Sequence, residues 1–302
     1  MQDNQEYRRG IGYAIAAYGM WGLVPIYFKA VDQVSALEVV SHRIIWSVLF
    51  LLLLLGIGRR WHDLKQLLGN RKLVSGLALS ALVVSSNWLV FIWAVAQERI
   101  LETSLGYFIN PLVSVFMGML FLQERLRPGQ WLAISLAAGA VGYQLVLLGS
   151  LPWVALALAF SFGTYGLLRK KIQVDAILGL FVETLLMLPF ALGYLLWLQT
   201  QGQLQFGHDG TDITALLALA GIVTSLPLLA FTAAARRLSL TLIGLLQYIG
   251  PTITFMLAVF YYHEPLDSDR LLTFILIWLA LLLFTAEGWR SKRRRRALPA
   301  AS

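Results

Sequence analysis

Ten long apolar segments occupy most of the 302-residue chain, and this feature limits its fold more than any other. A helix needs about 20 residues to cross the hydrocarbon core of a bilayer, so ten crossings would use roughly 200 residues. The apolar runs and the residues that interrupt them predict helices at residues 9–29, 36–56, 72–96, 103–122, 129–148, 151–169, 176–198, 212–235, 239–262 and 269–289. Because these are long helical runs rather than short alternating strands, a barrel is excluded. We expect an all-α polytopic membrane protein without a separate soluble domain.

The composition agrees with a membrane protein and excludes several classes of function. Hydrophobic residues make up 58% of the chain and charged residues only 13%, whereas a soluble domain has about 25% charged residues. The chain has no cysteine, which removes disulfides, thiolate metal sites and cysteine nucleophiles. We find no nucleotide-binding loop, zinc-protease helix or hydrolase elbow. We therefore expect no cofactor, no bound metal and no enzymatic activity.

Lys and Arg residues gather on one side of the expected helices. Twenty of the 24 lie in the N-terminal segment, the even-numbered connections and the C-terminal tail. The odd-numbered connections hold only Lys29, Arg99 and Arg270, and Arg43 falls inside a helix. The positive-inside rule then predicts that both termini are cytoplasmic. An even number of crossings agrees, because it places both termini on the same side. The net charge of +8 lies mainly at the membrane surfaces, so anionic lipids rather than nucleic acid are the expected partners.

The chain repeats itself at an offset of 140 residues. Residues 105–131 align with residues 245–271, so that Pro111 falls on Pro251 and Glu124 on Glu264. We therefore predict a first five-helix repeat at residues 7–149, a second at 150–290, and a basic cytoplasmic tail at 291–302. Because five is odd, the second repeat enters the membrane from the opposite side. Inverted repeats of this kind are typical of transporters that alternate access around a midplane site.

Several segments carry a family resemblance. They are SHRIIWS at 41–47, NWLVFIWAV at 87–95, LGYFINPLVSV at 105–115, GLLRKKI at 166–172, the pair at 183–184, and QYIGPT at 247–252. Together they resemble the RarD-type members of the EamA group in the drug/metabolite transporter superfamily, over residues 7–289. The resemblance implies a ten-helix exporter in the bacterial inner membrane, driven as a secondary transporter or by exchange with a counter-substrate. A channel and an intramembrane enzyme that uses His42 and Glu183 stay open as alternatives.

Arg43 and Glu183 are the charged residues whose positions most need an explanation. An Arg near mid-helix carries an insertion cost of about 2.5–3.5 kcal/mol, so Arg43 needs water, an anion or a partner. We expect Arg43 and His42 to face a polar cavity, where His42 could also couple protons; the alternative is that Arg43 extends to the outer interface. Glu183 is a candidate ion-coupling carboxylate, or else bonds to neighbouring helices. From their depths, Arg43 and Glu183 would line opposite halves of one pathway.

Polar and aromatic residues complete the predicted substrate cavity. Two stripes repeat in the fourth and ninth helices, where helix breaks are expected at Pro111 and Pro251; bonding between helices is the alternative. Aromatic walls would suit a small organic solute that is amino acid-like, aromatic or amphipathic. The predicted cavity residues are Arg43, His42, Trp21, Asn87, Trp88, Phe91, Tyr107, Asn110, Tyr165, Gln247 and Tyr248. The tryptophans could equally serve as interfacial belts.

Three further groups are expected at the ends of helices. Glu124 and Glu264 end equivalent helices, so we expect structural or gating roles, with bonds to the N-termini of neighbouring helices. Lys170 and Lys171 are predicted to set topology, although Arg169 could reach the inner mouth of the pathway.

Overall fold

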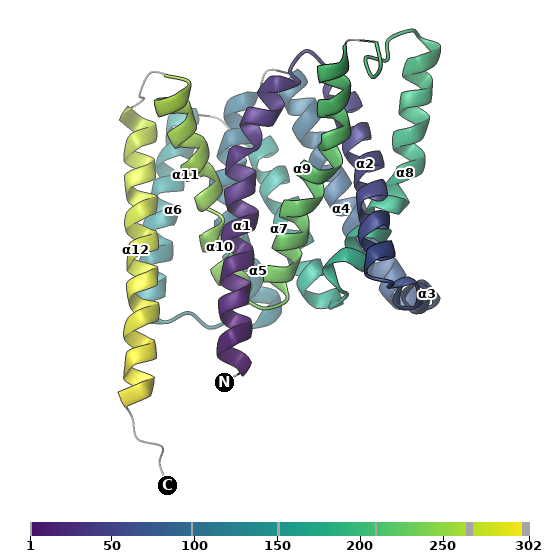
Figure 1. The fold of residues 1–302 in the computed structure, drawn as a ribbon. Helices are drawn as coiled ribbons and strands as arrows, with labels where there is room; N and C mark the ends of the chain where they lie inside the picture. Colours follow the sequence, from purple (N-terminus) through teal and green to yellow (C-terminus); the bar gives the residue numbers. More distant parts are fainter. Residues whose placement is uncertain (1, 98, 150–151, 209, 264–267, 298–302) are drawn as a thin grey trace.

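The computed structural model describes residues 2–97, 99–149, 152–208, 210–263 and 268–297. Within these ranges the chain is helical and contains no strand, as the apolar runs predict. Figure 1 shows the long helices standing side by side as one bundle, with the start of α1 and the end of α12 at the same end. The bundle is therefore all-α, and its described N- and C-terminal segments lie together.

The helix boundaries agree closely with the expected segments. The helices are α1 Gln2–Ala30, α2 Ala36–Ile57, α3 Trp61–Gly69, α4 Arg71–Ala96, α5 Ile100–Leu122, α6 Pro128–Leu148, α7 Trp153–Ile172, α8 Ala176–Thr200, α9 Thr211–Ala235, α10 Leu240–Leu246, α11 Ile249–Met256, the π-helical segment η1 Leu257–Tyr261, and α12 Ser268–Ala297.

Eight helical segments in the described ranges are long and apolar enough to cross a membrane. They are α1, α2, α4, α5, α6, α8, α9 and the stretch Leu240–Tyr261, which α10, α11 and η1 form together. Helix α7 is not among them; its last turn carries three basic residues. Helix α12 contributes the shorter apolar segment Leu271–Glu287. Eight crossings are thus supported by length and composition, and the count of ten stays a prediction.

Helix α3 was not expected from the sequence. It lies at the end of the bundle that holds the termini (Figure 1) and follows the basic pair Arg59 and Arg60. Only nine residues long, it buries Leu64 and Leu67 against the main core and leaves its charged side chains exposed. A helix this short gives too few apolar positions to stand out within a charged connection. Its amphipathic face becomes evident only when the core is in place.

The expected ninth helix is interrupted, whereas the expected fourth is not. Helix α10 ends at Leu246 and α11 begins at Ile249, two residues before Pro251. Because Pro251 has no N–H to donate to the carbonyl of Gln247, that carbonyl accepts the N–H of Gly250 instead, at 3.1 Å. Helix α5 instead runs without interruption through Pro111. The helix break expected at Pro111 is therefore absent. Neighbouring helices hold α5 on both sides, and a packed helix tolerates one lost backbone bond.

Close helix packing holds the bundle together, and helices from the two halves of the chain alternate in it. Helix α2 packs on α8 and α9, α4 on α7 and α8, α1 on α9 and α11, α5 on α7 and α10, and α6 on α12. Small residues permit the closest approaches. A Cβ atom on Gly221 of α9 would lie 2.2 Å from the backbone carbon of Trp46 in α2. The carbonyl of Gly221 also accepts a hydrogen bond of 3.2 Å from the Ser47 hydroxyl.

We predict that Gly221→Ala separates α2 from α9 and lowers the free energy of unfolding by about 1–3 kcal/mol, the usual cost of overpacking. Thermal unfolding of the purified protein in detergent measures the change. Gly193→Ala is the matched control, because a Cβ there meets nothing within 4 Å. Equal thermal stability of the two variants would contradict close packing of α2 on α9.

Candidate functional site

The Arg43 side chain lies among helices from both halves of the chain. Its Nε donates a hydrogen bond of 2.8 Å to the Thr224 hydroxyl of α9. Its guanidinium carbon lies 5.0 Å from the Trp88 ring centre of α4 and 5.6 Å from the Phe28 ring centre of α1. The expected alternative, extension of Arg43 to the outer interface, does not fit these contacts. Arg43 turns inward, where aromatic rings partly offset the loss of water.

Arg43 has no carboxylate partner in the part of the chain that the structure describes. No Asp or Glu side chain of the described residues lies within 4 Å of its guanidinium. Its Nη1 and Nη2 make no hydrogen bond to the described residues and are not buried from solvent. The tyrosines Tyr27 and Tyr107 lie within electrostatic range, and Tyr107 remains 50% exposed although protein surrounds it. The guanidinium therefore keeps donors that no described residue uses.

His42 does not share the surroundings of Arg43. Its ring stacks on Phe206, in the connection between α8 and α9, with ring centres 4.6 Å apart. Its Nε2 lies 3.8 Å from a carboxylate oxygen of Glu38, and that same oxygen accepts the backbone N–H groups of Gln205 and Phe206. His42 is therefore buried against this connection and makes no part of the Arg43 site. The reason is helical geometry, since adjacent residues point about 100° apart.

Glu183 pairs with Arg169, a partner that the sequence did not indicate. Oε1 of Glu183 lies 3.3 Å from Nη1 of Arg169, and both side chains are only 1% exposed. Nε of Arg169 also reaches the Thr232 hydroxyl of α9 at 3.4 Å. Arg169 is thus not at the inner mouth of a pathway but inside the bundle. The expectation that Glu183 does not pair with Arg43 agrees with this arrangement.

The Arg169–Glu183 pair leaves polar atoms unsatisfied. Nη2 of Arg169, Oε2 of Glu183 and the Tyr165 hydroxyl are buried without a hydrogen bond of good geometry. The guanidinium lies directly over Gly179, where a Cβ atom would come within 2.3 Å of Nη1. A buried pair with spare donors and acceptors is marginal in energy and sensitive to the loss of either partner.

An aromatic cluster connects α1, α7 and α9 beside this ion pair. Trp21 of α1 and Tyr165 of α7, which the sequence predicted as equivalent cavity residues, both contact Phe162 and Phe231. Tyr18 joins the cluster through Trp21 and Phe231. Trp21 and Tyr165 therefore lie in one cluster, in which both contact the same two phenylalanine rings. At an offset of 144 residues, Tyr18 falls on Phe162 just as Trp21 falls on Tyr165, so the repeat held a signal for both.

Three predicted residues of α4 have different surroundings. Trp88 faces Arg43, as described. The Asn87 amide donates to the Leu158 carbonyl and the Ser161 hydroxyl of α7, and Phe91 packs on the small cluster that includes Leu158. Asn87 and Phe91 therefore join α4 to α7 rather than facing Arg43. The difference follows from the helix face, since Trp88 lies on the other side of α4.

The predicted polar stripes are mostly buried between helices. Asn110 and Gln247 are buried, each with its amide oxygen unpaired, whereas Tyr107 keeps half its surface exposed. The Tyr248 hydroxyl donates 3.1 Å to the Phe108 carbonyl, which ties the α10–α11 break to α5. Pro251 follows this break. Of the two stripes, Tyr107 is the residue that accompanies Arg43.

Glu124 holds the start of a neighbouring helix, as expected. Its carboxylate accepts the backbone N–H groups of Leu240 at 2.6 Å and of Thr241 at 2.9 Å, the first residues of α10. A carboxylate there satisfies free N–H groups and complements the helix dipole. Its counterpart Glu264 lies outside the described residues.

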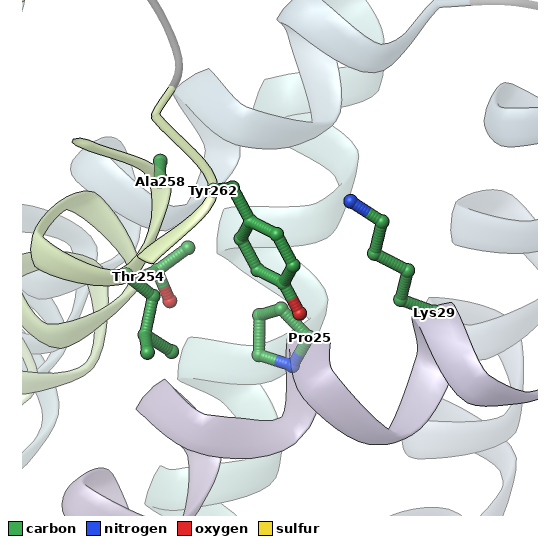
Figure 2. Close-up of a pocket in the computed structure, with 6 residues that line it drawn as sticks. Pro25, Lys29, Thr254, Ala258 and Tyr262 are labelled. Atoms are coloured by element: carbon green, nitrogen blue, oxygen red, sulfur yellow. The ribbon is translucent and has the colours of Figure 1, made fainter. Parts of the chain in front are cut away.

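A further cavity lies at the opposite end of α1 from the N-terminus. Its volume is about 180 Å³, and it is lined by Pro25, Lys29, Thr254, Leu257, Ala258 and Tyr262. Figure 2 shows the Tyr262 ring between Lys29 on one side and Thr254 and Ala258 on the other. The Lys29 ammonium lies 3.8 Å from the centre of that ring. From the sequence, Lys29 was counted only among the charges of the connections between helices.

Within the described ranges, no group of three or more His, Asp or Glu side chains is placed to hold a metal ion.

Comparison with known proteins decides the family. The EamA-like transporter family matches this chain twice, at residues 8–145 and 150–286. The chain belongs to the EamA-like transporter family. Within it, the chain is 52% identical over 289 residues to a protein of Vibrio cholerae named "Uncharacterized transporter", covering 96% of each. It is 48% identical to "Protein RarD" of Escherichia coli (strain K12), covering 97% of this chain and 99% of that protein.

More distant relatives agree with this assignment. A Pseudomonas aeruginosa protein named "Chloramphenicol-sensitive protein RarD" is 34% identical over 94% of this chain and 95% of its own length. A crystal structure with 16% sequence identity has a TM-score of 0.68 and covers 93% of this chain and 98% of its own. At that identity the likeness concerns the fold alone. The EamA-like bundle therefore has a solved counterpart over nearly its whole length.

We predict that Glu183→Gln in this EamA-like protein leaves Arg169 as an uncompensated buried charge. The free energy of unfolding should fall by about 3–5 kcal/mol, the usual cost of breaking a buried pair. The double variant Arg169→Met with Glu183→Gln should recover much of that loss, because it removes both charges. Thermal unfolding of Glu183→Gln, Arg169→Met and the double variant measures the coupling.

Asp63→Asn is the matched control, since Asp63 pairs with Arg60 near the protein surface. Such a pair contributes only about 0–1 kcal/mol. If Glu183→Gln is no less stable than Asp63→Asn, or if the losses of the two single variants simply add, the Arg169–Glu183 pair does not hold α7 to α8.

Proposed function

We propose that the protein is a secondary active transporter that exports or exchanges a small organic solute across the bacterial inner membrane. The observation that carries this proposal is Arg43, a guanidinium inside the bundle whose terminal nitrogens have neither a hydrogen bond nor a carboxylate partner among the described residues. Its neighbours come from α1 and α4 on one side and α9 on the other. A charge held between elements from both halves suits a site reached from each side in turn.

The helix packing supports two inverted five-helix repeats and ten crossings. The helices α1, α2, α4, α5 and α6 can be matched in order with α7, α8, α9, α10–α11 and α12. Under this matching, each main contact between helices corresponds either to another observed contact or to itself. The contact of α1 with α9 becomes that of α7 with α4, α5 with α7 becomes α11 with α1, and α2 with α9 becomes α8 with α4. The contacts of α2 with α8, α5 with α10 and α6 with α12 map onto themselves. The two family matches, which divide the chain at residues 145–150, support the same division.

The orientation we propose places both termini in the cytoplasm. Most Lys and Arg residues lie in the terminal segments and in the connections expected on that side, including the basic residues around α3. This surface would meet anionic lipids. Protons or a counter-substrate would supply the coupling, and Glu183 is the proposed ion-coupling group because it is a buried carboxylate whose Oε2 makes no hydrogen bond of good geometry.

Ion pairs join the two halves at the end that holds the termini. Glu6 of α1 lies 2.7 Å from Arg237, which follows α9, and Arg60 lies 2.6 Å from Asp175, the N-cap of α8. Glu124 adds the contact to α10. Alternating access requires the halves to separate at each end in turn, so these pairs would break when this end opens.

The absence of native cysteine permits a direct test of this separation. We predict that oxidised Glu6→Cys/Arg237→Cys protein stops transporting because its halves cannot part, and that a reducing agent restores transport. The single variants Glu6→Cys and Arg237→Cys control for loss of the ion pair. Lys65→Cys/Leu68→Cys, at two exposed positions of α3, is a control for cross-linking within one half. Undiminished transport by the fully cross-linked Glu6/Arg237 pair would argue against movement at this end.

Saturable counterflow in proteoliposomes tests the function itself. We expect vesicles loaded with unlabelled solute to accumulate the labelled form transiently, with rates that saturate. Labelled 3-phenylpropanoate, phenylalanine and phenethylamine are suitable first probes, because they share a phenyl body and differ in charge. Rates that rise linearly without saturation would indicate a channel, and product formation without uptake an enzyme. Absence of counterflow with all probes would count against the proposed transport of aromatic solutes.

A further inference from the structure

We infer that the Arg43 site binds a small organic carboxylate with an apolar body and no ammonium group. This inference rests on the proposed transport function and names the substrate class of that same site. It depends on the unpaired nitrogens of Arg43, on the aromatic rings beside them, and on the lack of an acidic side chain among their described neighbours.

The surroundings leave two nitrogens of the guanidinium, Nη1 and Nη2, without hydrogen bonds to the described residues. Nε is used by the Thr224 hydroxyl, whose own proton goes to the Ala220 carbonyl at 2.7 Å. This bond fixes the Arg43 side chain, while Nη1 and Nη2 stay accessible. Arginine presents these two nitrogens to carboxylates as a fork, with two parallel charge-assisted hydrogen bonds. A carboxylate is therefore the group that best complements the open edge.

The aromatic side chains provide the apolar part of the site. Trp88 and Phe28 lie beside the guanidinium, and Tyr107, which is half-exposed, lies within electrostatic range of Arg43. The Tyr27 hydroxyl donates 3.1 Å to the Leu216 carbonyl, so its proton is already used by the protein. An apolar body would gain contact with these rings when it leaves water.

The missing group is an acidic side chain. The ionisable groups that act on Arg43 from the helices packed around it are Tyr27 of α1 and Tyr107 of α5, and neither is a carboxylate. Glu183 is occupied by Arg169, and Glu38 lies against the connection between α8 and α9. An amino acid would bring an ammonium group into this site, where no described carboxylate could compensate it. The site therefore favours a carboxylic acid over a zwitterion or an amine.

Thermal stabilisation of the purified full-length protein tests this selectivity. The probes are 3-phenylpropanoate, phenylalanine, 3-phenylpropanamide and phenethylamine, which share a phenyl ring on a short chain and differ in charge. We expect 3-phenylpropanoate to raise the midpoint of unfolding and the other three to bind about 10- to 100-fold more weakly, the effect of one or two charge-assisted bonds. The stabilisation at increasing concentrations gives each dissociation constant.

Variants locate the effect. Arg43→Gln should abolish the preference for 3-phenylpropanoate over its amide, and Arg43→Lys should keep part of it, because the charge remains but the fork is lost. Thr224→Val should weaken carboxylate binding by releasing Nε. Arg71→Gln is the matched control, since Arg71 is exposed at the start of α4. It should bind 3-phenylpropanoate like the unaltered protein.

Three results would overturn the inference. They are equal binding of the amide or of phenylalanine, unchanged carboxylate binding by Arg43→Gln, and absence of binding by 3-phenylpropanoate. Counterflow separates this failure from failure of the proposed function. Saturable counterflow of phenylalanine or phenethylamine that is unaffected by Arg43→Gln would keep the transporter and reject the substrate class.

Discussion

The absence of water from the bilayer core is the constraint on which the rest of this structure depends. A polar group inside the bundle is costly unless it finds a partner in the protein or borders accessible space, because lipid offers none. Two arginines show two different responses to this cost. Arg169 is enclosed and paired with Glu183, whereas Arg43 has a hydroxyl partner, aromatic neighbours and accessible terminal nitrogens. The first arrangement joins helices, and the second leaves a charge for a ligand.

The same requirement explains how carboxylates are used at the helix ends. Glu124 binds the first N–H groups of α10, and Glu38 binds those of the connection before α9. Glu102 reaches the start of α7 at 3.4 Å and pairs with Arg99. Each of these carboxylates satisfies backbone donors on a different segment of the chain. These three carboxylates thus hold neighbouring segments of the chain in place.

Sequence reasoning succeeded where one residue is unusual for its own segment. Arg43 stands out because an arginine inside an apolar run always needs compensation. The expected break before Pro251 is present, whereas the same proline chemistry at Pro111 leaves α5 continuous. Sequence reasoning failed where the answer depends on a second helix. Arg169 looked like one of three loop cations because it follows an apolar run beside Lys170 and Lys171. His42 looked like a companion of Arg43 because it is adjacent in the chain, although the two residues point to different faces of α2.

The sequence by itself determined the all-helical class, the position of nearly every long helix, and the identity of the residues that cannot be lipid-facing. These properties are local, since they depend on segment length, apolar composition and the cost of charge in hydrocarbon. Only the tertiary structure decided which arginine receives the carboxylate and which remains unpaired. That choice depends on the depth and rotation of helices distant in the chain, and on glycines such as Gly179 that let one side chain lie against another backbone. No spacing within a single helix contains this information.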